Sequence, residues 1–265
     1  MPVSAAVREF DQIAPVYDDT REPLDETTLQ RLEEAIVETG CRSILEVGVG
    51  TGRIAKPLTD RNFNVTGLDA SRAMLARARA KQVPRLVRGN AYHLPFRARS
   101  FDGALFVHVL HVFDDPERVL REAARVVRGP VMAIVTKRER LPALPPTTDL
   151  ERVQDQIRQA FVESGLPPPR RRDPSARDQK LLEGFPPDQS RALSEVTVTE
   201  PVARRLDRME QRADRSTVGL PADKLHEILA KLRVEIGART ITRRSIRSWV
   251  AWNSERFMVP APGRP

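Results

Sequence analysis

Several features that mark particular protein classes are scarce in this sequence. Cys41 is the single cysteine among 265 residues, so no internal disulfide can form, and we expect the reducing setting of the cytoplasm. Every apolar run is far shorter than the roughly 18 residues that cross a bilayer, which predicts no transmembrane helix. Residues 1–12 (MPVSAAVREFDQ) lack a basic start followed by an apolar stretch, so we expect no secretory signal. The composition therefore favours a soluble globular protein.

The chain carries more positive than negative charge, and the excess lies in its second part. Lys and Arg number 44 against 36 Asp and Glu, a formal net charge of +8. Residues 1–136 hold 19 basic and 18 acidic side chains, whereas residues 137–265 hold 25 and 18, which gives +1 and +7. A basic segment favours an anionic partner such as nucleic acid. The arginines are dispersed, however, and dispersed charge is typical of compositional bias, so nucleic acid is the less favoured partner.

Short β-type runs alternate with helical patterns between residues 43 and 136. This order is typical of an α/β protein in which helices connect the strands of a parallel sheet. Ser71 is placed to cap the helix that follows the second run, and Asp114 or Asp115 to cap a helix with Pro116 at its first position. The predicted strands are 43–47 (SILEV), 64–69 (NVTGLD), 85–89 (RLVRG), 101–110 (FDGALFVHVL) and 129–137 (GPVMAIVTK).

The pattern changes after Lys137, where three proline-rich segments predict loops because proline fixes φ and removes a backbone donor. Between and beyond them, helical and alternating patterns return. The segments predicted as helices are 149–164, 175–183, 203–214 and 222–235, and those predicted as strands are 193–200 and 239–253.

The glycine-rich segment ILEVGVGTGRIA (residues 44–55) is the most informative part of the chain. An acidic residue on a buried strand, Glu46, precedes Gly48 and Gly50, and glycines there permit a tight turn and a close approach of a ligand to the backbone. A dinucleotide-binding G-x-G-x-x-G fingerprint would need glycine at position 53, where the chain has Arg53. A nicotinamide cofactor, bound through its pyrophosphate, is therefore disfavoured.

The same segment resembles the E/D-x-G-x-G-x-G loop of class I S-adenosylmethionine-dependent methyltransferases, of the small-molecule type that includes the ubiquinone and menaquinone methyltransferases. The resemblance extends over residues 10–136. It implies an α/β, Rossmann-like fold with a seven-stranded, mostly parallel sheet, an antiparallel last strand and helical cap insertions. It also implies that Glu46, Gly48 and Gly50 surround the amino-acid end of the cofactor, S-adenosylmethionine.

The resemblance suggests one domain with three parts. Residues 1–40 would form a helical lid, residues 41–136 the cofactor-binding core, and residues 137–265 the rest of the sheet together with helices that cap the substrate. Within the lid, REFDQIAPVYDDTRE (8–22) resembles the family's F-D-x-x-A-x-x-Y-D segment, which implies that Tyr17 covers the cofactor; an ordinary amphipathic entry helix is the alternative.

Two further segments match parts of the family that bind the adenosine. Asp69 ends the second strand, where a carboxylate can accept hydrogen bonds from both ribose hydroxyls. By resemblance Ala70 and Met74 lie beside the adenine, although core packing explains Met74 equally well. The segment RGNAYHLPF (88–96) resembles the family's G-D-A-x-x-L-P-F segment. This resemblance implies that Asn90 contacts the adenine in place of the usual acid, and that Ala91 and Tyr92 lie beside the base.

Two histidines lie at the carboxyl end of the fourth predicted strand, within residues 100–127, which resemble the family's fourth strand and the helix after it. His108 and His111 would lie at the end of the sheet where open α/β folds bind ligands. Imidazole titrates near pH 6.5, so either is a candidate base or substrate contact, and His108 a cofactor contact as well. Packed or surface histidines without a catalytic role are the alternative.

These residues predict methyl transfer to a small organic metabolite by direct displacement. The alternatives are an RNA or tRNA methyltransferase, favoured by the charge of residues 137–265, and a non-catalytic cofactor-binding protein with the same fold. A metal-assisted mechanism with Asp114 and Asp115 lacks a third ligand, so we expect no metal. Cys41 precedes the first strand, away from the cleft, which disfavours cytosine C5 methylation, and the absence of an N-P-P-Y motif disfavours adenine N6 methylation.

Overall fold

A seven-stranded sheet forms the centre of the computed structural model, which describes residues 5–21, 24–139, 150–169, 174–211, 217 and 219–257. The strand order is β3-β2-β1-β4-β5-β7-β6, and β1 to β5 pair in parallel, while β7 runs antiparallel to both β5 and β6. This confirms the predicted sheet with its antiparallel last strand. The strands are β1 (Ser43–Val47), β2 (Asn64–Asp69), β3 (Leu86–Arg88), β4 (Gly103–Val107), β5 (Val131–Glu139), β6 (Gln189–Pro201) and β7 (Thr240–Trp252).

Helices cover both faces of this sheet. On one face, Leu32 and Leu58 pack with Ile44 of β1 in one buried apolar cluster. On the other face, Leu120 packs with Phe106 of β4 in a second cluster. Burial of a large apolar side chain stabilises the fold by about 1.5–3 kcal/mol, so both layers are needed to hold the sheet. The helices of the two layers are α2 (Glu26–Glu38), α3 (Ala55–Asp60) and α4 (Arg72–Ala80) on the first face, and α5 (Pro116–Val126) and α7 (Pro174–Gly184) on the second.

The ends of β4 and the start of α3 differ from the sequence prediction. The fourth strand was expected over 101–110 but spans Gly103–Val107, because His108 has a φ of +50° and turns the chain out of the sheet into the short 3-10 turn η3 (Leu110–Val112). His108 therefore follows the strand instead of lying on it, and His111 lies in η3. The helix expected from about residue 52 begins at Ala55, because Gly50 and Gly52 have positive φ values that an α-helix cannot accommodate.

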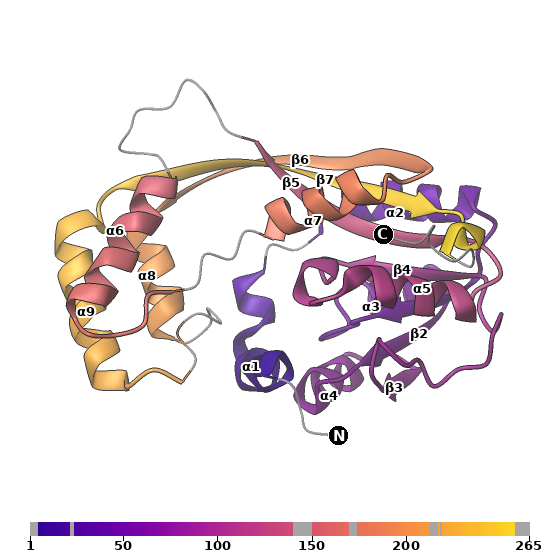
Figure 1. Ribbon diagram of the computed structural model, residues 1–265, viewed down its shortest axis with the longest axis horizontal. Helices are drawn as coiled ribbons and strands as arrows, with labels where there is room; N and C mark the ends of the chain where they lie inside the picture. Colours follow the sequence, from indigo (N-terminus) through magenta and orange to yellow (C-terminus); the bar gives the residue numbers. More distant parts are fainter. Residues whose placement is uncertain are drawn as a thin grey trace, which may run out of the picture.

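A helical bundle lies at the far end of the molecule from β3. The 13-residue strands β6 and β7 run beyond the rest of the sheet, and Figure 1 shows the bundle at their end. Phe161, Leu206 and Leu229 are fully buried in the bundle's own apolar cluster. The helices are α6 (Leu150–Glu163), α8 (Val202–Glu210) and α9 (Ala222–Ile236); the predicted residues 149 and 212–214 of these helices lie outside the described residues.

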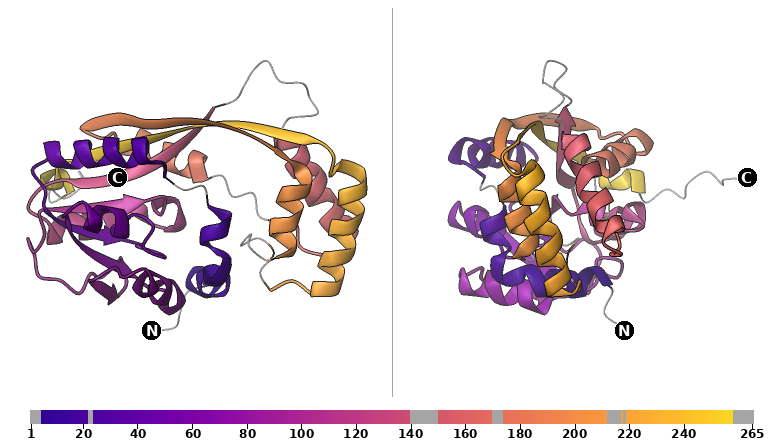
Figure 2. Two further views of the ribbon diagram at one scale, coloured as in Figure 1. Left: turned by 180° about the vertical axis from the view of Figure 1, so that it is seen from behind. Right: turned by 90° about the vertical axis from the view of Figure 1, so that its left-hand side faces the viewer.

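The N-terminal segment divides into two parts. Helix α1 (Ala5–Ile13) lies between the core and the bundle along the long axis of the molecule, in both opposite views of Figures 1 and 2. Ile13 packs on Met74 of α4. Helix α2, by contrast, belongs to the layer that covers the sheet. The lid expected over residues 1–40 stays a prediction, and α2 packs on the sheet within those residues.

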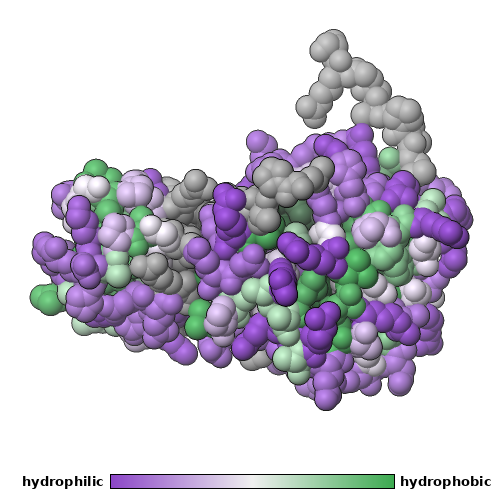
Figure 3. All heavy atoms as spheres, turned by 90° about the horizontal axis from the view of Figure 1, so that it is seen from below, coloured by the Kyte–Doolittle hydropathy of each residue, from purple (hydrophilic) through white to green (hydrophobic). Residues whose placement is uncertain are grey.

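The surface of the protein is largely hydrophilic when seen from below, with apolar side chains gathered over the larger, core part (Figure 3). Within the described parts of the chain, none of the helices is long and apolar enough to cross a membrane. Among the same residues, Val234 is the most exposed large apolar side chain, at 89%.

Candidate functional site

The glycine loop after β1 brings backbone groups and a buried carboxylate to the carboxyl end of the sheet. Glu46 is only 2% exposed, and its Oε2 has no hydrogen-bond partner among the described residues. The backbone N–H groups of Gly48 and Val49 both donate to the carbonyl of Leu68, at 2.8 and 3.0 Å, which fixes the loop to β2. The loop therefore presents Glu46 at a defined position beside the end of the second strand.

The glycines of the loop serve two different purposes. A Cβ at Gly48 would lie 2.7 Å from Val109 Cγ2, and one at Gly52 2.7 Å from Val83 Cγ2, so these glycines allow close packing. Gly50 has a φ of +55°, but a Cβ there would meet nothing within 4 Å. Gly50 thus borders open space at the tip of the loop, where a ligand can approach the backbone closely.

Asp69 connects the glycine loop with the start of α4. Its Oδ2 accepts a hydrogen bond from the Gly50 N–H, and its Oδ1 accepts one from the Ser71 N–H, each at 2.8 Å. Burial raises the pKa of Asp69, and these backbone bonds act in the opposite direction. Ser71 caps α4 by accepting from the Met74 N–H, as predicted. Asp69 therefore fixes the glycine loop on one side and the start of α4 on the other, and its side chain is half-buried beside Gly50.

The pKa of Glu46 lies well above its ordinary value of 4.5, chiefly because of burial and secondly because of the nearby Asp69 carboxylate; the Ala55 N–H has the smaller, opposite effect. The unpartnered oxygen of Glu46, close to Asp69, can accept a hydrogen bond from a ligand that brings a donor. A molecule with hydroxyl groups and an ammonium fits this edge.

Two acidic residues that the sequence analysis did not single out attach the N-terminal segment to this edge. Asp11 accepts hydrogen bonds from the Ser71 hydroxyl at 2.5 Å and from the Ala73 N–H at 3.1 Å. Asp18 accepts from the Thr51 hydroxyl at 2.6 Å and pairs with Lys81 at 2.6 Å. Both aspartates occur in the F-D-x-x-A-x-x-Y-D segment, which was the available signal. The N-terminal segment is thus held directly over the glycine loop.

Tyr17 lies between these two anchors. Its ring contacts Phe10 edge-on at a centroid distance of 6.3 Å, and the guanidinium of Arg21 lies 4.7 Å from the ring centre. Tyr17 therefore occupies the expected segment, and its contact with the cofactor stays a prediction. Met74 is buried against Ile13, in keeping with the core-packing alternative. The adenine contacts of Met74 and of the neighbouring Ala70 likewise stay predictions.

The segment after β3 is shaped by local contacts. The amide oxygen of Asn90 accepts from the Tyr92 N–H at 3.0 Å, which leaves one of its two lone pairs for a ligand. Tyr92 packs edge-on against Phe113, and its hydroxyl accepts from the N–H of Asp115, the residue that caps α5. Ala91 is buried in the core. Binding of the base by these residues stays a prediction, with Asn90 the most exposed of the three.

The two histidines after β4 lie in different environments. His108 Nδ1 is 3.3 Å from the Thr136 hydroxyl of β5. Burial, followed by the positive charge of Arg247, lowers the pKa of His108 to about 3, so its imidazole is neutral at pH 7. His111 Nδ1 lies 3.6 Å from Oδ1 of Asp178 on α7, slightly beyond hydrogen-bond distance. The sequence did not reveal that Asp178 lies beside His111, because nothing in residues 175–183 connects them with η3.

Comparison with known proteins agrees with this geometry. Residues 45–133 match the methyltransferase domain family. The demethylmenaquinone methyltransferase of Thermotoga maritima is 34% identical over 170 residues, 61% of this chain and 71% of that protein. The phosphatidylethanolamine N-methyltransferase of Cereibacter sphaeroides is 36% identical over 135 residues, 48% of this chain and 65% of the relative, just under two thirds of its length. A Bacillus halodurans C-125 structure assigned as a methyltransferase shares the fold, with a TM-score of 0.50 at 18% identity, over 84% of this chain and 97% of that one.

The fold and the site define a class I S-adenosylmethionine-dependent methyltransferase. The chain belongs to the same family as the demethylmenaquinone methyltransferases. S-adenosylmethionine carries ribose hydroxyls and an ammonium, donors that Asp69 and the unpartnered oxygen of Glu46 can accept, so the residues present fit this cofactor.

Glu46 gives rise to a prediction about stability and pH. The pKa of Glu46 is higher in the folded protein than in the unfolded chain, so folding favours the neutral form of this side chain. The stability that the neutral form provides is fully present below the pKa of the unfolded chain and is lost as pH rises through the pKa of the folded protein. Glu46→Gln should therefore make the cofactor-free protein more stable than wild type at pH 8, with the difference vanishing near about pH 4. Urea unfolding at the two pH values measures this. The exposed Glu235→Gln serves as a control without effect, and a less stable Glu46→Gln protein at pH 8 would contradict the assignment.

Proposed function

We propose that this protein methylates a small organic molecule, with the cofactor held by the carboxyl edge of β1 and β2. The observation that carries the proposal is the arrangement of Glu46, Gly50 and Asp69: Glu46 has a buried, unpartnered oxygen near Asp69, and Asp69 accepts from the N–H of Gly50, which borders open space. Asp69 would accept from the ribose hydroxyls, and Glu46 would face the amino-acid end. Tyr17 and the segment anchored by Asp11 would cover the cofactor.

The chemistry assigns a limited task to the protein. S-adenosylmethionine supplies an activated methyl group, so transfer is a displacement on the methyl carbon by a nucleophile of the acceptor. The residues around the end of β4 then have to align the acceptor, exclude water and, where the acceptor carries a proton, remove it. Alignment alone can contribute roughly 7–11 kcal/mol to the lowering of a barrier.

His111 suits proton removal better than His108. A general base is most effective when its pKa lies near the working pH. The pKa of about 3 makes His108 a weak base, and its closeness to Thr136 suits a role in lining the site. His111 faces a buried carboxylate that can orient its ring.

His111→Ala should lower the methyl-transfer rate by about 10²–10⁴-fold, the usual contribution of a general base. His108→Ala should affect acceptor binding and should lower the methyl-transfer rate less than His111→Ala. The measurement is transfer of labelled methyl from S-adenosylmethionine between pH 5 and 9, with His226→Ala, 70% exposed on the bundle, as the control. Unchanged turnover of His111→Ala would remove the residue from the mechanism.

A small-molecule acceptor is favoured over RNA. The relatives named above act, by name, on demethylmenaquinone and phosphatidylethanolamine. In the basic second part of the chain, arginines are paired with acids: Arg208 with Glu200 at 2.8 Å, and Arg233 with Asp207 at 2.8 Å. Such pairing reduces the local field that would attract a phosphate backbone. Steep salt dependence of RNA binding would reverse this preference, and cofactor binding without turnover across a wide acceptor panel would favour a non-catalytic role.

A further inference from the structure

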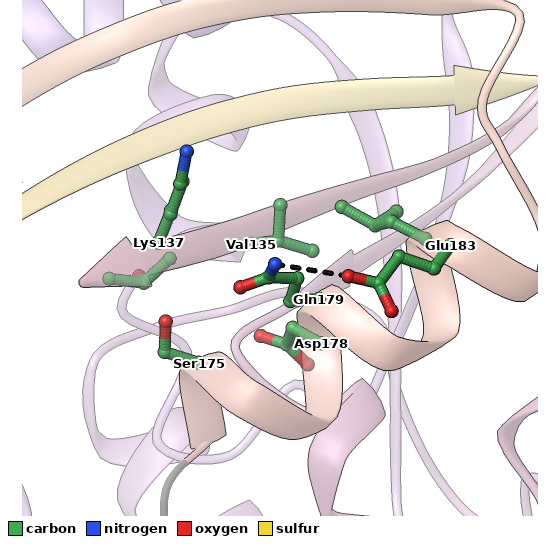
Figure 4. Close-up of a pocket in the computed structure, with 8 residues that line it drawn as sticks. Val135, Lys137, Ser175, Asp178, Gln179 and Glu183 are labelled. Atoms are coloured by element: carbon green, nitrogen blue, oxygen red, sulfur yellow. Dashed lines mark hydrogen bonds between the residues drawn. The ribbon is translucent and has the colours of Figure 1, made fainter. Parts of the chain in front are cut away.

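A cavity of about 250 Å³ lies between β5 and α7 (Figure 4). Its apolar floor includes Val135 and Leu182. Thr136 belongs to the lining, and its hydroxyl is the group 3.3 Å from His108 Nδ1, so the cavity adjoins the end of β4. The volume falls below the roughly 300–1,000 Å³ of sites that enclose a whole drug-sized ligand, which suits the polar head of a small molecule.

Asp178 contributes a buried carboxylate to this cavity. Its side chain is 3% exposed, and neither its Oδ1 nor the Nδ1 of His111 has a hydrogen-bond partner among the described residues, although they lie 3.6 Å apart. Catalytic hydrogen bonds are often long in unliganded proteins and shorten when substrate binds. An acid that accepts from Nδ1 keeps the proton on that nitrogen and leaves the lone pair of Nε2 to act as base.

The charged side chains that line the cavity are more acidic than basic. Asp178 and Glu183 offer two carboxylates against one ammonium, that of Lys137. Figure 4 shows Gln179 and Glu183 side by side on α7, with the Gln179 amide donating to Glu183 at 3.0 Å, which orders this carboxylate at the exposed rim. Ionised carboxylates only accept hydrogen bonds, so the group they recognise must donate, and their excess negative charge favours a cation.

We propose that this cavity binds the methyl acceptor, that the accepting group is a primary or secondary amine, and that Asp178 is a positioning residue for His111. The inference rests on the proposed function. The ammonium enters protonated and gives its proton to Nε2 of His111. The nitrogen lone pair then forms a bond to the methyl carbon as the carbon–sulfur bond breaks, and that electron pair stays on sulfur. The products are a methylated ammonium, a neutral thioether and a protonated His111, so the two positive charges of the ammonium and the sulfonium are conserved.

Matched ligand pairs test the class of acceptor. Calorimetry first establishes that the protein binds S-adenosylhomocysteine. The protein is then titrated by ligand-observed NMR with two matched pairs, benzylamine with benzyl alcohol and phenethylamine with phenethyl alcohol. We expect each amine to bind at least about tenfold more tightly than its alcohol, since hydrogen bonds to charged groups are the stronger ones. Asp178→Asn and the rim variant Glu183→Gln should each remove most of this preference, whereas the exposed Asp223→Asn should retain it.

The outcomes separate the two proposals. Absence of S-adenosylhomocysteine binding by the folded protein overturns the proposed function. Binding of that nucleoside together with equal affinities for amines and alcohols, or with a preference that survives both variants, overturns the acceptor class alone. Because Glu183 is exposed, its variant folds even if Asp178→Asn does not.

The role of Asp178 has a separate spectroscopic readout. Long-range ¹⁵N–¹H spectra of the four histidines, with His111 assigned from His111→Ala, should show its proton on Nδ1 in wild type. In Asp178→Asn, a substantial fraction of the His111 side chains should carry the proton on Nε2 instead, since an amide can donate to Nδ1. Asp223→Asn should leave the spectrum unchanged, and an unaltered tautomer in Asp178→Asn would overturn the positioning role.

Discussion

Gly50→Ala should weaken S-adenosylmethionine binding by about 10–100-fold, with little loss of stability beyond the cost of the backbone conformation. Gly50 has a φ of +55°, and a left-handed conformation costs an L-residue about 1–2 kcal/mol. Its Cβ would meet no protein atom within 4 Å, so the added methyl enters the open space into which the cofactor is proposed to fit. Overpacking of this kind costs about 1–3 kcal/mol, and here the cost falls on the bound state.

Gly40→Ala is a matched control for this variant. Gly40 follows α2, has a φ of +75°, and a Cβ there also meets nothing within 4 Å, so the backbone cost is comparable. Urea unfolding should show similar destabilisation of the two variants, while calorimetry should show reduced affinity in Gly50→Ala alone. Equal affinity in both variants would mean that the loop tip does not contact the cofactor.

Asp69→Asn should weaken S-adenosylmethionine binding by about 100-fold and lower the free energy of unfolding by about 1–3 kcal/mol. Each carboxylate oxygen accepts from a backbone N–H, of Gly50 on one side and of Ser71 on the other. An amide has a single acceptor oxygen, so one of these N–H groups would face an NH₂ group. The change would therefore loosen the glycine loop and remove an acceptor for the ribose.

Asp60→Asn provides the corresponding control. Asp60 pairs with Lys56 one helical turn away, and its side chain is 55% exposed. Exposed pairs of this kind contribute about 0.3–0.5 kcal/mol. Its variant should match wild type in affinity by calorimetry, and wild-type affinity in Asp69→Asn as well would contradict the assignment of the ribose ligand.

Most of the sheet was predictable because its signals are local. Buried β-branched runs mark β1 and β2, and the caps Ser71 and Asp115 occupy the predicted positions and accept the expected backbone N–H bonds. The end of β4 was not predictable in the same way. A positive φ at His108 depends on how the chain packs after the strand, and no residue type announces it.

The site was predictable only where one segment carries its own pattern. Glu46 and Gly50 follow from the glycine loop, whereas the contact between His111 and Asp178 joins residues far apart in sequence, brought together by the docking of α7 on β5 and η3. Asp11 and Asp18 lay within a matched segment, but their bonds to Ser71 and Thr51 depend on how that segment folds back.

Titration calorimetry with S-adenosylmethionine tests the central claim most directly, namely that the edge formed by Glu46, Gly50 and Asp69 holds the cofactor. The account predicts one site in wild type, retained in Gly40→Ala and Asp60→Asn and strongly weakened in Gly50→Ala and Asp69→Asn. A folded wild-type protein that binds no S-adenosylmethionine, or that binds it equally well after both site substitutions, would contradict the account.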